Sequence, residues 1–316
     1  MSTQLTVSTS PHVHSEFTTR GIMFSVILAL LPAGVIGTYF LGIRSLYVIA
    51  TCVFACILSE WFWQKCVMKT KTTLGDLSAI VTGLLLAYNL PPTMPLWMAV
   101  CGSIFAIIVV KGFYGGLGCN IVNPALAARA MMLISWPTAM TTWTVQGISG
   151  ATPLAAMKAG SEINISCWDL LVGNMGGCIG ETCSVLLILG GIYLIWEGVI
   201  SWRIPVIYIA TASILAACFG HGGVMTEIFT GGLLIGAIFM ATDYTTSPMS
   251  AKGQVIYAFG CGLLTALIRT WGGYPEGVSF SILIMNIAVP LIDKYTAPKI
   301  LGAPKSNFFK KTEAKK

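Results

Sequence analysis

Long apolar runs separated by short polar stretches extend from residue 22 to residue 295. A membrane-spanning helix needs about 20 predominantly apolar residues. Ile22–Leu41 and Leu46–Val67 both reach this length, so they predict the first two spans. The next run, in "DLSAIVTGLLLAYNLPP", stops early at its prolines and predicts a shorter segment.

The same pattern continues along the rest of the chain. A full segment is expected at 96–114, and a shorter one at Pro124–Trp136, which contains Arg129. After a polar interlude, further runs occupy 181–200, 204–219, 226–241, 253–271 and 278–295. The predicted fold class is therefore an all-α polytopic membrane protein with about ten transmembrane helices.

The composition supports this class. Of the 316 residues, 55% are hydrophobic and 9% charged, whereas soluble domains carry about 25% charged residues. A soluble core of this size cannot hide so much apolar side chain, which excludes a soluble globular protein. The first 20 residues are polar, and the apolar run after them is too long for the core of a signal peptide, so we interpret it as a true span.

The distribution of lysine and arginine predicts the topology. With the N-terminus inside, the cytoplasmic side receives Lys65, Lys69, Lys71, Arg203, Lys252 and the lysines of the tail (Lys294, Lys299, Lys305, Lys310, Lys311, Lys315 and Lys316). The other side receives Arg44, Lys158 and little else. Cytoplasmic loops carry the Lys/Arg excess. Both termini are therefore expected in the cytoplasm, and the loop at 136–180 outside it.

An internal repeat is visible between residues 80–116 and 228–273. Each segment opens with a Thr-Gly pair, breaks at polar residues or prolines, continues into a full span, and ends with a basic residue and a Gly-Gly pair. Two halves of five spans each would have opposite topology, and such inverted repeats form a site near the membrane midplane. The alternative is that Gly and Pro are simply common in membrane helices.

These observations divide the chain into five parts. We expect a cytoplasmic N-terminal segment at 1–20, a first membrane repeat at 21–135, an extracytoplasmic loop at 136–180, a second membrane repeat at 181–296, and a basic cytoplasmic tail at 297–316.

The loop contains an unusual polar stretch, "TTWTVQGISGATPLAAMK", at 141–158. Thr152 is a natural helix N-cap, Pro153 a natural first helical residue, and Gly160 a natural end of that helix. The hydroxyl of Thr152 has no evident base beside it, so nucleophilic catalysis by this residue alone is not expected.

Four motifs in this order resemble one family. "SGAT" (Ser149, Gly150, Ala151 and Thr152) matches a covalent flavinylation motif, [S/D]GAT. "SPHVHSEFTTRGIMFSVILALLPA", "NIVNPALAARA" and "FMATDYTTSP" are similar to further signatures of the RnfD/NqrB family. The resemblance extends from residue 10 to about residue 296. It is closer to RnfD-type than to NqrB-type subunits, because the chain lacks the longer N-terminal extension of the latter.

The resemblance implies a fold, cofactors and partners. The family fold has ten membrane helices in two inverted five-helix halves, related in architecture to urea channels. Its members carry FMN esterified through its phosphate to the motif threonine, here Thr152, and associate with a second, non-covalent flavin such as riboflavin. The phosphate would lie at a helix N-terminus, where free N–H groups and the helix dipole favour an anion.

In the Rnf complex of bacterial cytoplasmic membranes, such a subunit helps to couple ferredoxin:NAD oxidoreduction to Na+ or H+ translocation. The implied partners are the A, B, C, E and G subunits, including a second flavinylated subunit and soluble iron–sulfur subunits, and a flavin transferase for maturation. The chain has no dinucleotide fingerprint and no cluster motif, so it is an oxidoreductase subunit that is not catalytic alone.

Other residues are weaker candidates. Lys111, Asn123 and Arg129 lie in or near membrane segments and are candidate cofactor contacts, since charges in lipid are costly. Asp76 and Asp243 border the short segments of the two halves and are candidates for an ion pathway. Equally, each of the five has a structural interpretation as a polar helix-end residue.

The ten cysteines are scattered without a CxxC pair, so no metal site is predicted. Most lie in apolar runs, where cysteine behaves as a small hydrophobe. A disulfide between Cys167 and Cys178 is conceivable but has no support from spacing.

Three alternatives stay open. One is an NqrB-type subunit of a Na+-pumping NADH:quinone reductase. Another, from a different class, is a solute channel or transporter on the same inverted-repeat fold, because fold does not settle function. A third is a scaffold that only holds other subunits together. A channel has no need of a flavin, so the presence of a bound flavin would distinguish a redox subunit from a channel.

Overall fold

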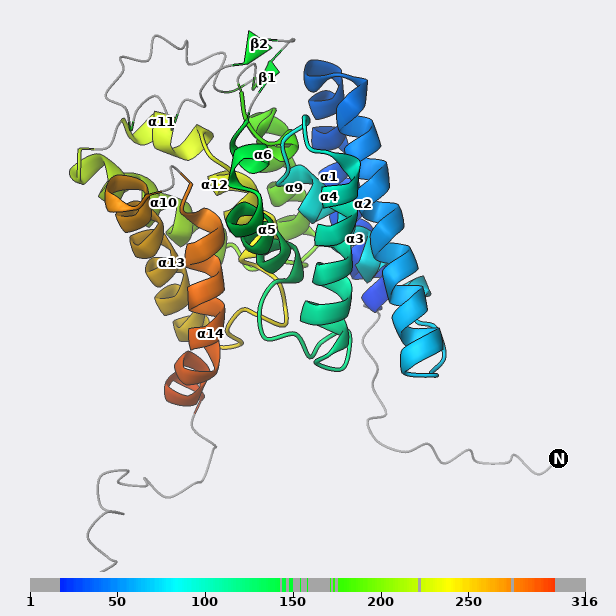
Figure 1. Ribbon diagram of the computed structural model, residues 1–316. Helices are drawn as coiled ribbons and strands as arrows, with labels where there is room; N and C mark the ends of the chain where they lie inside the picture. Colours follow the sequence, from blue (N-terminus) through cyan, green and yellow to red (C-terminus); the bar gives the residue numbers. More distant parts are fainter. Residues whose placement is uncertain are drawn as a thin grey trace, which may run out of the picture.

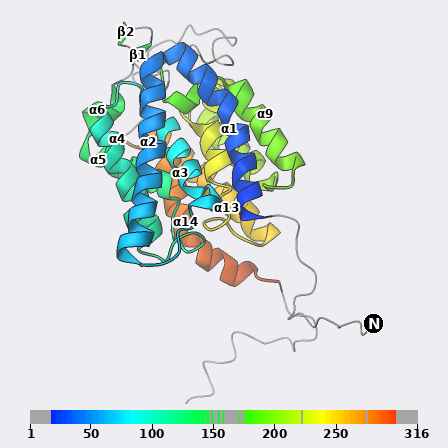
Figure 2. The same cartoon turned by 90° about the vertical axis from the view of Figure 1, so that its right-hand side faces the viewer.

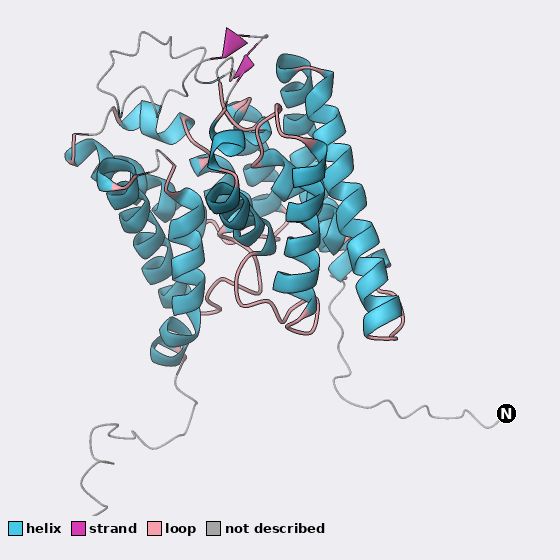
Figure 3. Cartoon of the chain, viewed as in Figure 1, coloured by secondary structure: helices cyan, strands magenta, loops and turns pink. Residues whose placement is uncertain are grey.

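The computed structural model describes residues 18–142, 144–145, 148–149, 154, 158, 171, 173, 176–220, 223–273 and 276–298. Most of them are helical (Figure 3).

The first half of the chain begins with two long helices and continues with shorter ones. Its elements are α1 (Thr19–Leu41), α2 (Ile43–Phe62) extended by the π-helix η1 (Trp63–Val67), the 3-10 turn η2 (Leu74–Asp76), α3 (Ser78–Tyr88), α4 (Leu96–Ile104) extended by the π-helix η3 (Phe105–Gly112), α5 (Pro124–Ser135) and α6 (Pro137–Thr141). Local chemistry sets these ends. Thr18 caps α1 through its side chain, and Gly42, at φ +88°, separates α1 from α2.

The second half begins with shorter helices and ends with two long ones. It contains the 3-10 turn η4 (Ile179–Glu181), α9 (Ser184–Trp196), α10 (Arg203–Cys218), α11 (Val224–Phe229), α12 (Leu233–Ile235) extended by the π-helix η5 (Gly236–Met240), α13 (Ala251–Trp271) and α14 (Val278–Thr296). The break between α11 and α12 falls at Gly231 and Gly232, whose φ values of +69° and +65° favour glycine.

Every apolar segment predicted from the sequence contains helix. Four are long and apolar enough to cross a membrane as single helices: Thr19–Leu41, Ile43–Val67, Ala251–Trp271 and Val278–Thr296. The others are shorter apolar helices. The predicted all-helical fold class is confirmed, with one small addition. β1 (Thr144–Val145) pairs antiparallel with β2 (Ile148–Ser149) in a small hairpin, since Gln146 and Gly147 separate the two strands by only two residues.

The short helices lie between two flanks of long ones. Figures 1 and 2 show α1 and α2 on one flank, α13 and α14 on the other, and α3, α5, α9 and α12 between them. The start of α1 and the end of α14 lie at the same end of the molecule, and the hairpin lies at the opposite end (Figure 1).

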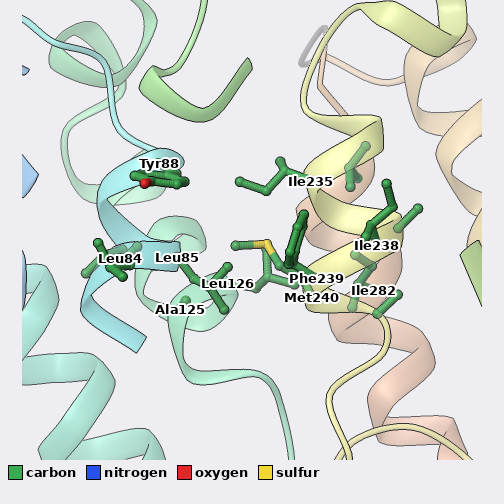
Figure 4. Packing of buried hydrophobic residues seen from close by; sticks show 14 of the residues in the cluster. Leu84, Leu85, Tyr88, Ala125, Leu126, Ile235, Ile238, Phe239, Met240 and Ile282 are labelled. Carbon is green, nitrogen blue, oxygen red and sulfur yellow. The ribbon is translucent and has the colours of Figure 1, made fainter. Parts of the chain in front are cut away.

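The core is formed where the short helix α3 approaches the helix made of α12 and η5. In Figure 4, Leu84, Leu85 and Tyr88 of α3 lie opposite Ile235 and Phe239 of α12 and η5. Close backbone contacts support this packing. A Cβ at Gly83 would lie 2.7 Å from Val53 Cα, so glycine lets α3 approach α2. The Tyr88 hydroxyl donates to the Leu30 carbonyl at 3.0 Å, which ties α3 to α1.

Candidate functional site

A buried ion pair lies at the end of η3. Lys111 Nζ is 2.7 Å from Glu60 Oε1 on α2 and 2.6 Å from Ser78 Oγ at the start of α3. Lys111 and Glu60 are 3% and 4% exposed, so both charges are removed from water and depend on each other. Asp76 Oδ1 accepts from Ser78 N at 2.9 Å and from Ser78 Oγ at 2.7 Å. One network therefore fixes the N-terminus of the short helix α3.

A second buried pair occupies the matching place on α13. Arg269 NH1 is 2.6 Å from Glu227 Oε2 on α11. Its other nitrogen, NH2, donates to the carbonyls of Thr230 at 3.0 Å and Gly231 at 3.2 Å. The guanidinium thus holds the unwound backbone between α11 and α12. In both halves, the basic residue that precedes the Gly-Gly pair anchors the short helix of its own half.

A third buried cation joins the halves. Arg129 of α5 donates through NH1 to Asn89 Oδ1 at 3.2 Å and to Ser279 Oγ at 2.8 Å. Its NH2 forms an ion pair with Glu276, just before α14. NH2 also faces Cys178 Sγ at 3.5 Å. Arg129 therefore connects the end of α3, the start of α14 and the segment that leads into α9.

A cavity of about 300 Å³ lies among α1, α3, α9, the start of α5 and η5. Its walls are mostly apolar, with Met23, Val26, Leu85 and Phe239 among the lining residues. The polar lining groups come from distant parts of the sequence and include Ser78, Lys111, Asn120, Asn123, Asp243 and Thr245. A mostly apolar space with a few polar groups is typical of a site for a small molecule or cofactor.

The polar wall of this cavity is a hydrogen-bonded cluster. Asp243 Oδ2 accepts from Thr245 Oγ1 at 3.0 Å and from Asn120 Nδ2 at 3.5 Å. Thr246 Oγ1 donates to the same carboxylate oxygen at 3.2 Å. Thr245 Oγ1 also donates to Asn120 Oδ1 at 3.0 Å. These contacts link the loop before α5 with the loop after η5, so the wall belongs to both halves.

The structure separates the candidates that the sequence suggested. Lys111, Asn123 and Asp243 all line the cavity. Asn123 is also the N-cap of α5, because its Oδ1 accepts from Ala125 N at 3.0 Å, and its Nδ2 donates to the Met240 carbonyl at 3.2 Å. Arg129 and Asp76 are not among the lining residues.

The flavinylation motif lies largely outside the described residues, which include Ser149 in β2 but not Gly150, Ala151 or Thr152. Cys178 is a free thiol that donates to the Asn89 carbonyl at 3.3 Å. Cys167, its conceivable disulfide partner, lies outside the described residues.

The acidic partners of the buried cations were not predicted from the sequence. These are Glu60, Glu227 and Glu276, together with Glu181 at the entry to α9. A signal was present, because Glu60 and Glu227 fall within predicted spans, where an ionisable residue requires a partner. Glu181 is the first residue of a predicted span and Glu276 lies just before another, and only the folded arrangement brings them to Arg129.

Comparison with known proteins decides the family. The model of the NQR2, RnfD, RnfE family matches residues 6–302. The chain belongs to this family.

Named relatives of the family align over almost their whole length. The D subunit of a Na+-translocating ferredoxin:NAD+ oxidoreductase complex from Acetobacterium woodii is 49% identical, over 95% of this chain and 96% of the relative. The D subunit of a proton-translocating ferredoxin:NAD+ oxidoreductase complex from Clostridium ljungdahlii is 46% identical, over 94% of this chain and 96% of the relative. The D subunit of an ion-translocating oxidoreductase complex from Stutzerimonas stutzeri is 38% identical, over 89% of this chain and 91% of the relative.

Proposed function

We propose that this chain is the flavin-carrying membrane subunit of a complex that couples electron transfer between ferredoxin and NAD+ to the translocation of Na+ or H+. The observation that carries the proposal is the near full-length similarity to relatives named as the D subunits of such complexes. The flavins carry out the redox chemistry, and the chain holds them in place and provides the charged and polar groups around them.

In this proposal Thr152 carries FMN as a phosphoester on the extracytoplasmic side. Support comes from the "SGAT" motif and from the position of the hairpin that leads into it, at the end of the molecule opposite the described chain ends (Figure 1). Two residues just after the motif contact the second half. Leu154 is buried against Gly231, and Lys158 Nζ donates to the Gly272 carbonyl. These contacts would hold the flavin-bearing segment near the helix break.

We further propose ten spans in two inverted halves, with both termini in the cytoplasm of a bacterial cell. The order of elements supports this, because α1–α5 and α9–α14 each contain two helices, a shorter helical segment (α3 in one, α11 with α12 and η5 in the other), a longer helix and a final helix. The buried pairs of Lys111 and Arg269 occupy matching places in this order. The partners would be the A, B, C, E and G subunits, and soluble iron–sulfur subunits among them would deliver the electrons.

The cavity between the halves suits a second, non-covalent flavin. An isoalloxazine ring has two apolar faces and one edge with alternating hydrogen-bond acceptors and a donor. Leu85 and Phe239 offer apolar surface, and Asn120, Asp243 and Thr245 offer donors and acceptors on one wall. A cavity of about 300 Å³ lies within the usual range for small-molecule sites. Asn120 and Asp243 would hold the polar edge of the ring.

Asn120→Ala is expected to weaken the binding of this flavin by about five-fold to a hundred-fold, since an unpaired hydrogen-bonding partner costs about 1–3 kcal/mol. The flavin released by acid from the purified complex is measured after washing in flavin-free buffer. Gln254→Ala, on α13 and outside the cavity lining, is the matched control. If both variants release equal amounts of flavin, the cavity is not the site of the non-covalent flavin.

Affinity purification through a tag on this chain tests the proposed function as a whole. The expected preparation contains the partner subunits, shows ferredoxin-dependent NAD+ reduction, and retains flavin on this chain after denaturation. A flavin-free chain that purifies without redox partners would contradict the proposal.

A further inference from the structure

Two carboxylates share one arginine where the halves meet. Carboxylate oxygens of Glu181 and Glu276 lie, with Cys178 Sγ, within 4.8 Å of one another. Arg129, which is 5% exposed, is paired with Glu276. The group contains one guanidinium and two carboxyl groups. When both carboxyl groups are ionised, one negative charge is left without a counter-charge among the described residues around it. Such a charge is costly in a low-dielectric interior and calls for a proton or a small cation.

Glu181 is the carboxylate that remains available. Its Oε1 atom is buried and has no hydrogen-bond partner among the described residues. A cavity of about 10 Å³ adjoins it, with Ser184, Thr230 and Gly232 among the other lining residues. Such a volume is about the size of one water molecule. Carboxylate, hydroxyl and carbonyl oxygens are the ligands that hard cations prefer.

The backbone beside this cavity is a helix break with a fixed conformation. Thr230, Gly231 and Gly232 separate α11 from α12, and both glycines have positive φ. Arg269 holds the break through the carbonyls of Thr230 and Gly231. In membrane transporters, unwound backbone at a helix break near the midplane often coordinates the transported ion. The helix break and the uncompensated carboxylate of Glu181 therefore lie at the same cavity.

We propose that Glu181 is the exchangeable ligand of a site for one monovalent cation, Na+ or H+, and that the Arg129–Glu276 pair sets the charge of this site. A single uncompensated carboxylate matches a single positive charge, whereas a divalent ion would leave the buried site with excess positive charge. The inference rests on the proposed function and deepens it, because it assigns a residue to the translocated cation.

The test uses the assembled complex, purified through this chain and reconstituted in proteoliposomes. Glu181→Gln keeps the shape of the side chain and leaves the neutral Arg129–Glu276 pair, so the complex is expected to assemble with normal flavin content. The rate of ferredoxin-dependent NAD+ reduction in detergent is expected within two-fold of wild type. The cation transported per electron is expected to fall at least ten-fold. Transport is measured with and without Na+, and with a protonophore, which distinguishes Na+ from H+ as the occupant.

Glu197→Gln, at the other end of α9 and exposed, is the matched control and is expected to transport normally. Glu181→Asp, which keeps the charge but shortens the side chain, is expected to retain transport with a raised half-saturating cation concentration. Unchanged transport per electron in Glu181→Gln would overturn the inference. So would a Glu181→Asp complex whose cation dependence equals that of wild type, and this second variant decides the matter where Glu181→Gln fails to assemble. Loss of transport in the wild-type complex itself would instead count against the proposed function.

Discussion

Thr152→Ala is expected to abolish the covalent flavin of this chain and to reduce ferredoxin-dependent NAD+ reduction by at least a hundred-fold. Alanine has no hydroxyl to esterify, so no phosphoester forms, and the electron path loses one of its carriers. The chain is co-expressed with its flavin transferase, separated on a denaturing gel and viewed under ultraviolet light. The modified peptide is then identified by mass spectrometry.

Thr142→Ala is the matched control, because Thr142 is an exposed residue just before the hairpin and outside the motif. It is expected to keep full fluorescence and activity. If the wild-type band shows no fluorescence while the transferase modifies another protein, Thr152 carries no flavin and serves only as a helix N-cap. Loss of assembly without loss of electron transfer in Thr152→Ala would favour a scaffold.

Arg269→Gln is expected to have the largest effect on stability among single substitutions in the described residues. Removal of one member of a buried ion pair costs about 3–5 kcal/mol. The substitution also removes the donors to the carbonyls of Thr230 and Gly231, so the break before α12 loses its support. Thermal unfolding of the purified complex, together with the amount of chain in the membrane, measures the effect.

The comparison that isolates the pair uses Glu227→Gln and the double variant. Each single substitution is expected to be strongly destabilising, and the double variant to be less so than the sum of the two, since both charges are then removed together. Lys252→Gln, an exposed lysine on the same helix α13, is the matched control. Additive effects in the double variant would mean that the ion pair itself contributes little.

The long helices were predictable because their cause is local. Runs such as Ile22–Leu41 contain the whole signal for a span, and an Asn-Pro pair such as Asn123–Pro124 contains the whole signal for a helix start. The hairpin β1–β2 was missed, because its strands are two residues long and show no alternating pattern. The π-helical extensions of α2 and α4 have no signature in the sequence either.

The candidate site was predictable only in its local parts. Lys111 was suspected because it is a charge in a predicted membrane segment, and Asp243 because it borders a short apolar segment. The cavity itself was not, because its walls come from α1, α3, α5, α9 and η5, which only tertiary packing brings together. For the same reason Arg129 and Glu276, 147 residues apart, gave no sign of their pairing. Only the fold shows which buried charges share a site.

Cation transport driven by electron transfer is the decisive measurement for the proposed function. The complex purified through this chain is reconstituted in proteoliposomes and supplied with reduced ferredoxin and NAD+. We expect Na+ or H+ to accumulate in step with NAD+ reduction, and accumulation to stop when Thr152→Ala replaces the wild-type chain. Passage of a solute through the reconstituted chain without any electron donor, and no cation movement during electron transfer, would contradict the proposed function and favour a channel on the same fold.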